Sequence, residues 1–139
     1  MCIRDRDGAN VEIRDLVGEE NFFLFGHDET GIARLWKEGY NPKSHMSDEV
    51  WEAINLVKGG HFSNGNKEIF EPLVNNLVEH DPFCVMADFH DYCDAQDRVS
   101  SAWKDWKNWQ RMSLINVARS GFFSSDRSIR DYCNTIWRI

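Results

Sequence analysis

Residues 17–26 read VGEENFFLFG, and this stretch decides how the rest of the chain is interpreted. Its second half, Phe22 to Phe25, is an unbroken block of aromatic and aliphatic side chains that closes at Gly26. A short apolar run that ends at a turn residue is typical of a β-strand buried on both faces. We therefore expect a buried strand at residues 22–25.

Apolar residues before this block predict a short helix. Val11, Ile13, Leu16 and Val17 recur at helical spacing directly before Gly18. Glycine readily adopts the left-handed conformation that ends helices, so the helix is expected to stop there. The predicted order at this end of the chain is therefore helix, turn and strand.

Helices are predicted through the sequence that follows the strand. Asp28 and Ser47 are helix-capping residue types, and each precedes a segment with apolar residues at helical spacing. The helix after Asp28 is expected to end near Gly39. A further helix is expected to begin near Glu71, because Pro72 is tolerated only in a first turn.

A long amphipathic helix is expected in the second half of the chain. We predict a short extended segment at residues 83–87, followed by a helix that Asp88 caps. Trp103, Trp106 and Trp109 lie three residues apart. A stripe of large aromatic side chains at this spacing is usually a packing face, so we expect the three to be core residues.

A last helix is predicted after the capping residues Ser124, Ser125 and Asp126. The apolar residues of this helix are Ile129, Tyr132, Cys133, Ile136 and Trp137. They fall on one face, which needs a surface on which to dock.

Composition excludes several classes of function. The 139 residues are 42% apolar and 13% aromatic, which is enough to bury a core. The formal charge is −7 and the 16 basic residues are scattered, which argues against a nucleic acid partner. No apolar run approaches the roughly 20 residues that span a bilayer. Widely spaced cysteines without a secretion signal predict reduced thiols and a cytoplasmic location.

The residues by themselves indicate no catalytic or metal centre. Cys84, His90 and Cys93 lie close together in sequence, but they lack the paired spacing that zinc sites use, so no metal is expected. Cys84 is a candidate nucleophile with His80 or His90 as its base, but the preferred interpretation is that these histidines are solvated or core residues. No glycine-rich phosphate loop is present in the sequence.

Several motifs resemble the glycogen and starch phosphorylase family of α-1,4-glucan phosphorylases. They are DGANVEI at residues 7–13, VGEENFFLFG at 17–26, HDPF at 80–83, ADF at 87–89 and SGxFSSDRSI at 120–129. They occur in the family's order over essentially residues 7–139, whereas residues 1–6 do not match. We therefore expect a junction outside the family at 1–6 and a C-terminal portion of the cofactor-carrying lobe at 7–139.

The resemblance implies a fold class and an activity. Members of the family are α/β glycosyltransferases of the two-lobed GT-B type, so this chain is expected to be a helix-rich C-terminal part of one Rossmann-like lobe with an incomplete sheet. The implied reaction is phosphorolysis of glycogen, starch or maltodextrin to α-D-glucose 1-phosphate with pyridoxal 5'-phosphate. The implied partners are the rest of the phosphorylase chain, the α-glucan, inorganic phosphate and a second subunit of a homodimer.

The resemblance places the cofactor lysine upstream of DGAN, in a loop that this chain lacks. None of the six lysines matches that loop, so no catalytic, cofactor-binding or metal-binding residue is assigned and the fragment alone is expected to be inactive. Asp7, Gly8, Asn10 and Glu12 are the matched positions nearest the loop. They are candidates to contact the residues that line the cofactor pocket, rather than the cofactor itself. Asn10 is also a candidate helix cap.

An alternative from a different class remains open. The chain would then be a non-catalytic helical interaction module derived from a phosphorylase. Such a module would bind its partner through the face that carries Trp103, Trp106 and Trp109.

Overall fold

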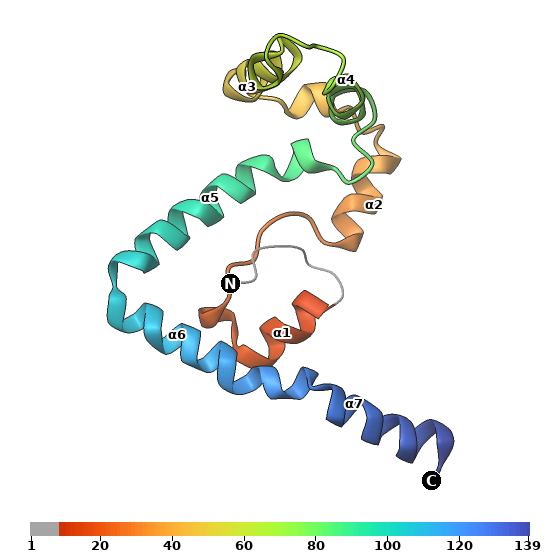
Figure 1. Cartoon of the computed structure of the whole chain (residues 1–139), viewed down its shortest axis with the longest axis vertical. Coiled ribbons are helices and arrows are strands. Elements are labelled where there is room, and N and C mark those ends of the chain that lie inside the picture. Colours follow the sequence, from red (N-terminus) through yellow and green to blue (C-terminus); the bar gives the residue numbers. More distant parts are fainter. Residues whose placement is uncertain (1–8) are drawn as a thin grey trace. The chain divides into compact units, whose positions relative to one another are not determined.

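The computed structural model describes residues 9–139, and helices dominate them (Figure 1). The α-helices are α1 (Ala9–Val17), α2 (Glu29–Lys37), α3 (Asp48–Lys58), α4 (Glu71–Asn75), α5 (Val85–Lys104), α6 (Trp106–Arg119) and α7 (Ser125–Asp131). Short 3-10 segments are η1 (Glu19–Asn21), η2 (Pro42–His45), η3 (His61–Ser63) and η5 (Ser120–Phe123), and π-helical segments are η4 (Asn76–His80) and η6 (Tyr132–Trp137). The predicted helix-rich character is confirmed, whereas the α/β class with an incomplete sheet is not seen, because residues 9–139 form no strand. Within the described residues, no helix is long and apolar enough to cross a membrane.

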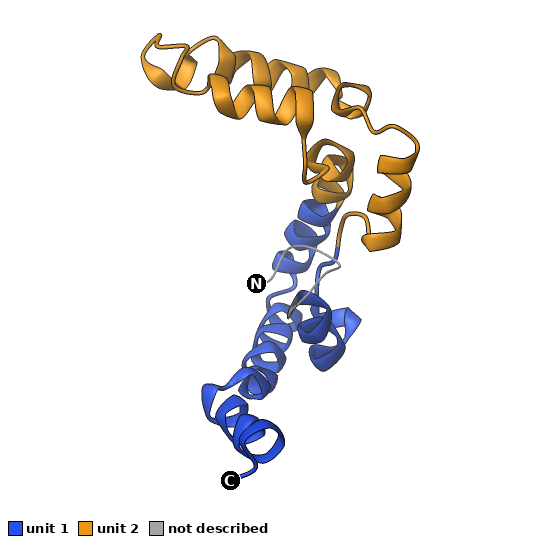
Figure 2. Cartoon of the chain, turned by 90° about the vertical axis from the view of Figure 1, so that its right-hand side faces the viewer, with its two compact units in different colours: residues 1–24, 95–139 blue, residues 25–94 orange. Residues whose placement is uncertain are grey.

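The chain divides into two compact units, coloured separately in Figure 2. Unit 1 contains residues 1–24 and 95–139, and unit 2 contains residues 25–94. Helix α5 contributes residues to both units, because the boundary falls between Asp94 and Ala95. The predicted domain boundary after residue 6 lies outside the described residues and stays a prediction.

Residues 22–25 do not form the predicted strand. Phe22 has an extended backbone, with φ −138° and ψ 147°, but from residue 9 onward the structure contains only an isolated bridge at Phe23. A strand forms when neighbouring strands pair with its successive N–H and C=O groups, and the described chain supplies no second strand. Phe22 and Phe23 are nevertheless buried, each with 7% exposure. The expected burial is thus confirmed for these two, and the expected strand is wrong.

Helix ends that depend on local chemistry agree with the sequence predictions. Helix α1 stops directly before Gly18, whose φ is +90°. The side chains of Asp28 and Ser47 each accept a hydrogen bond from the backbone N–H three residues later, at the starts of α2 and α3. Helix α4 has Pro72 in its first turn, as expected.

The start of α5 differs from the prediction. Residues 83–87 are not extended, and Asp88 lies inside the first turn of α5 rather than before it. The carboxylate of Asp81 satisfies the helix start instead, since it accepts from the backbone N–H groups of Val85 at 2.9 Å and Met86 at 2.8 Å. The predicted extended segment and the predicted Asp88 cap are both wrong.

The predicted tryptophan core is wrong for Trp103 and Trp106. Asp105 separates α5 from α6 and caps α6 by accepting from the N–H three residues later. This break interrupts the stripe, and Trp103 and Trp106 are 54% and 55% exposed. Their rings meet edge to face at 5.4 Å, and Trp103 contacts Trp109 in the same way at 5.0 Å. Trp103 thus packs against both other rings but lies outside a core, as does Trp106, whereas Trp109 is half-buried.

The core of unit 2 is a contiguous apolar cluster. Its buried members are Val50, Ile54, Val74, Val78 and Met86, which come from α3, α4, η4 and α5. Helices separated in the sequence thus contribute to one cluster, and this burial is the main favourable contribution to the stability of the unit.

Unit 1 packs α1 and the residues after it against α6. Phe23 approaches Trp109 with ring centroids 6.5 Å apart. The side-chain amide of Asn116 donates to the carbonyl of Asn21 at 3.0 Å, which joins α6 to η1. Met112 is buried at the same side of α6, with 6% exposure.

Gly26 is a position in unit 2 at which a side chain is poorly tolerated. Its φ is +83°, and a Cβ there would lie 2.7 Å from Oδ2 of Asp88. Asp88 in turn accepts from the backbone N–H of His27 at 2.9 Å and lies 2.6 Å from its Nδ1. A side chain at residue 26 therefore disturbs both the backbone and the Asp88 contacts.

We expect Gly26→Ala to lower the free energy of unfolding by about 2–3 kcal/mol, from about 1–2 for the left-handed backbone and about 1 for the disturbed hydrogen bonds. Urea unfolding followed by circular dichroism measures the change. Gly39→Ala is the matched control, because Gly39 has φ +85° and open space around its Cβ position. Equal losses in the two variants would contradict the contact with Asp88.

Candidate functional site

The structure describes two of the four residues expected to support a cofactor pocket. Asp7 and Gly8 lie outside the described residues. Asn10 and Glu12 lie on α1, which begins at Ala9, so Asn10 lies within the helix and not at its cap position. The expected capping role of Asn10 is therefore wrong. The supporting role of the four residues is untested and stays a prediction.

No described lysine has the environment of a cofactor-binding lysine. All six lysines are exposed, and the ammonium of Lys43 pairs with Glu79 at 2.6 Å. A lysine that forms a Schiff base is activated by a desolvated pocket or a neighbouring cation. The lysines present therefore do not fit pyridoxal phosphate.

The histidines and cysteines do not come together as a reactive or metal-binding group. Within residues 9–139, no set of three or more His, Cys, Asp or Glu side chains is placed to hold a metal ion. His80 and His90 are exposed, whereas Cys84 is fully buried. Burial, with smaller effects of the carboxylates of Asp81 and Asp88, raises the pKa of the Cys84 thiol. A thiol of raised pKa is a poor nucleophile, so Cys84 is a structural residue.

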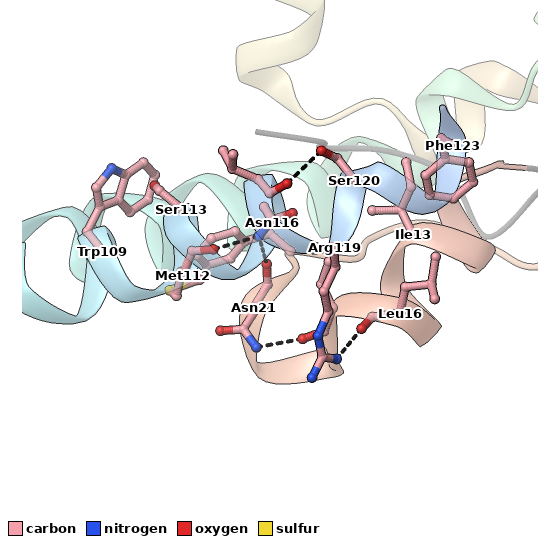
Figure 3. A pocket seen from close by; sticks show the side chains of 13 residues that line it. Ile13, Leu16, Asn21, Trp109, Met112, Ser113, Asn116, Arg119, Ser120 and Phe123 are labelled. Atoms are coloured by element: carbon pink, nitrogen blue, oxygen red, sulfur yellow. Dashed lines mark hydrogen bonds between the residues drawn. The ribbon is translucent and has the colours of Figure 1, made fainter. Parts of the chain in front are cut away.

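A pocket of about 400 Å³ lies in unit 1 between α1, η1 and α6 (Figure 3). Most of its lining is apolar and includes Ile13, Leu16, Phe23, Met112 and Val117. Pockets of roughly 300–1,000 Å³ are large enough for a small molecule or for several apolar side chains. Sequence analysis missed this pocket, because its lining reads as ordinary helix-packing positions.

Polar side chains at the pocket hold α1 and η1 against α6 (Figure 3). The guanidinium of Arg119 donates to the carbonyl of Leu16. The side chain of Asn116 donates to two carbonyls, one of them that of Asn21. Asn21 donates to the carbonyl of Val17 at 2.7 Å, but its own Oδ1 is buried without a hydrogen-bond partner among the described residues.

A second polar cluster, in unit 2, surrounds Asp81. This residue is 1% exposed, and its carboxylate accepts from the hydroxyl of Tyr40 at 2.7 Å and from two backbone N–H groups of α5. Burial, together with the hydrogen bond and charge of Asp81, raises the pKa of Tyr40. The carboxylate of Asp81 thus links Tyr40 to the start of α5 through hydrogen bonds. The Asp81-Pro82 pair is a turn signal that a closer reading of the sequence would have found.

Both clusters belong to helical units in which polar side chains hold neighbouring helices together through hydrogen bonds. Comparison with known proteins then gives the family, since the Carbohydrate phosphorylase family model matches residues 1–139. The chain belongs to the carbohydrate phosphorylase family.

Curated relatives agree with this assignment. Glycogen phosphorylase of Synechocystis sp. is 46% identical to the chain over 141 residues. The muscle forms of glycogen phosphorylase from Bos taurus and Homo sapiens are 40% identical over the same length. Each alignment covers 100% of this chain, and the chain spans 17% of the length of each of these relatives.

Removal of the Tyr40 hydroxyl tests the Asp81 cluster. We expect Tyr40→Phe to lower the free energy of unfolding by about 1–3 kcal/mol, because a buried carboxylate loses one of its hydrogen-bond donors. Tyr92→Phe is the control, since the ring of Tyr92 packs edge-on against Phe25 at 5.4 Å and the substitution keeps that ring. Similar unfolding midpoints for the two variants would contradict a role for the Tyr40 hydroxyl.

Alkaline pH is expected to destabilise unit 2. Folding raises the pKa of Cys84 from an ordinary value of 9.0 and that of Tyr40 from 10.0, so both groups ionise more easily in the unfolded chain. Their contribution to stability is complete below about pH 9 and is lost as the pH rises further.

The urea midpoint should therefore fall between about pH 9 and pH 11, and above about pH 10 it should fall less steeply in Tyr40→Phe than in the native chain. A urea midpoint that does not change with pH in this range would show that folding does not raise the pKa values of Tyr40 and Cys84.

Proposed function

We propose that this chain forms part of the cofactor-carrying lobe of an α-glucan phosphorylase of the GT-B type. The parent enzyme would phosphorolyse glycogen, starch or maltodextrin to α-D-glucose 1-phosphate. The observation that carries this proposal is the family match over residues 1–139, supported by 46% identity to a glycogen phosphorylase. Because the chain spans only 17% of that relative, the activity is assigned to the longer polypeptide and not to these residues alone.

Pyridoxal phosphate is assigned to the parent enzyme in the same way. The exposed lysines of this chain do not fit the group, so residues elsewhere in the longer polypeptide are proposed to hold it. Asp7, Gly8, Asn10 and Glu12 are proposed to support the wall of its pocket without touching the reacting atoms. A cytoplasmic location follows from the same assignment.

The rest of the phosphorylase chain is the partner that this proposal requires. The last helical stretch, α7 and η6, leaves Ile129, Tyr132, Ile136 and Trp137 between 49% and 62% exposed. Contiguous exposed apolar side chains of this kind usually mark an interaction site. We propose that other parts of the parent chain cover this face, in a parent that is a homodimer.

A second candidate function rests on the exposed aromatic rings. Trp103 and Trp106 are more than half exposed, which suits a helical interaction module that has no catalytic role. Exposed tryptophans are enriched at protein interfaces. The two candidates differ in whether the chain supports catalysis when it is placed within a phosphorylase.

A chimera tests the proposal. Residues 7–139 would replace the matching segment of Synechocystis sp. glycogen phosphorylase, with the native relative as the control. We expect the chimera to release glucose 1-phosphate from glycogen and inorganic phosphate, whereas the 139-residue chain alone should show neither activity nor a covalent pyridoxal phosphate adduct by mass spectrometry.

A chimera that folds and contains pyridoxal phosphate but lacks activity would overturn the assignment to a phosphorylase lobe and favour the interaction module. An adduct on a lysine of the isolated chain would overturn the statement that these lysines do not hold the cofactor.

A further inference from the structure

The pocket of unit 1 leaves the packing of α1 and η1 against α6 incomplete. It is open to solvent beside Ser113 and Val117 of α6, which both line it and are exposed. Val117 is 72% exposed, although it lines the same pocket as the buried Met112. An apolar pocket with exposed apolar side chains at its edge is a surface that something else normally covers.

The surroundings of the pocket favour a polypeptide over a small molecule. Leu114 is 69% exposed and lies three residues from Val117, so the two side chains are neighbours on the helix surface. A small molecule within about 400 Å³ would fill the pocket and leave Leu114 in water. A polypeptide segment can cover both the pocket and the adjoining surface of α6.

We propose that this pocket is the docking site for an apolar segment of the remaining phosphorylase polypeptide. The inference rests on the proposed function and adds a specific contact surface to it. The chain spans 17% of the length of its glycogen phosphorylase relatives, so a parent of similar length supplies most of its polypeptide from outside these residues. The surface differs from the α7 and η6 face, because it lies on α1, η1 and α6.

The chemistry of the lining specifies the segment. Among the described residues that line the pocket, Arg119 is the only one with a charged side chain, and its guanidinium already donates to the carbonyl of Leu16. The described lining therefore presents no unpaired charge to an occupant, which selects uncharged apolar side chains. The unpaired Oδ1 of Asn21 is a buried acceptor in the same lining, so a hydrogen-bond donor is expected beside it.

Cysteine labelling in two contexts tests the inference. Ser113→Cys would be introduced into the 139-residue chain and into the chimera described above. Peptide mass spectrometry would then measure the rate at which N-ethylmaleimide alkylates this cysteine in each protein. We expect labelling at least about tenfold slower in the chimera, a difference that corresponds to occlusion of the site. Ser101→Cys, on the exposed surface of α5 and outside the pocket lining, is the matched control and should react at similar rates in both proteins.

A larger side chain gives an independent measurement. Ser113→Phe should leave the thermal midpoint of the isolated chain unchanged or raise it, because the pocket has room for the ring. The same substitution should lower the midpoint of the chimera, because the ring competes with the docked segment.

Three outcomes would overturn the inference. They are equal labelling of Ser113→Cys in both proteins, equal slowing at Ser113 and Ser101, and protection that disappears once the chimera has been unfolded, dialysed and refolded. The last result would identify a small molecule as the occupant.

The same measurements distinguish this inference from the proposed function. An active chimera with a fully reactive Ser113→Cys would reject this docking site and leave the proposed function intact. An inactive chimera with a protected cysteine would reject the proposed function and leave the docking site intact.

Discussion

Unit 2 depends on the placement of one buried carboxylate, that of Asp81. A charged group with 1% exposure is tolerated only when hydrogen bonds replace its lost hydration, and Asp81 receives them from Tyr40 and from the first turn of α5. These donors fix where α5 begins. They also place Met86 in the apolar cluster with residues of α3 and α4. The start of α5 and the position of Met86 in the core therefore both depend on Asp81, whose carboxylate also adds to the effect of burial in raising the pKa values of Tyr40 and Cys84.

Local chemistry explains which features the sequence predicted correctly. Gly18, Asp28, Ser47 and Pro72 act within three or four residues of themselves, and the helix ends near them agree with prediction. Features that depend on distant partners were predicted wrongly. The strand at residues 22–25 needed strands that the described chain does not contain, and the Asp88 cap was displaced by Asp81, whose role depends on Tyr40 forty-one residues away.

Among the functional features, the family could be predicted from the sequence, whereas the pocket could not. Motif order identified the family, which the match over residues 1–139 confirms, whereas no side-chain geometry in the described residues would have indicated glucan chemistry. The pocket of unit 1 was not predictable, because helix periodicity marks which residues face inward but not whether the space between them is filled. Family and architecture are therefore separable conclusions here, since one rests on residue order and the other on packing.

The two units also differ in how they are held together. Unit 2 has a contiguous cluster of buried apolar residues, whereas unit 1 has a pocket between α1 and α6 and relies on side-chain hydrogen bonds from Asn116 and Arg119 to backbone carbonyls. Regions with few buried apolar contacts open at low free energy. The amide protons of α1 should consequently exchange with solvent through local opening, well before the cooperative unfolding that releases those of α3.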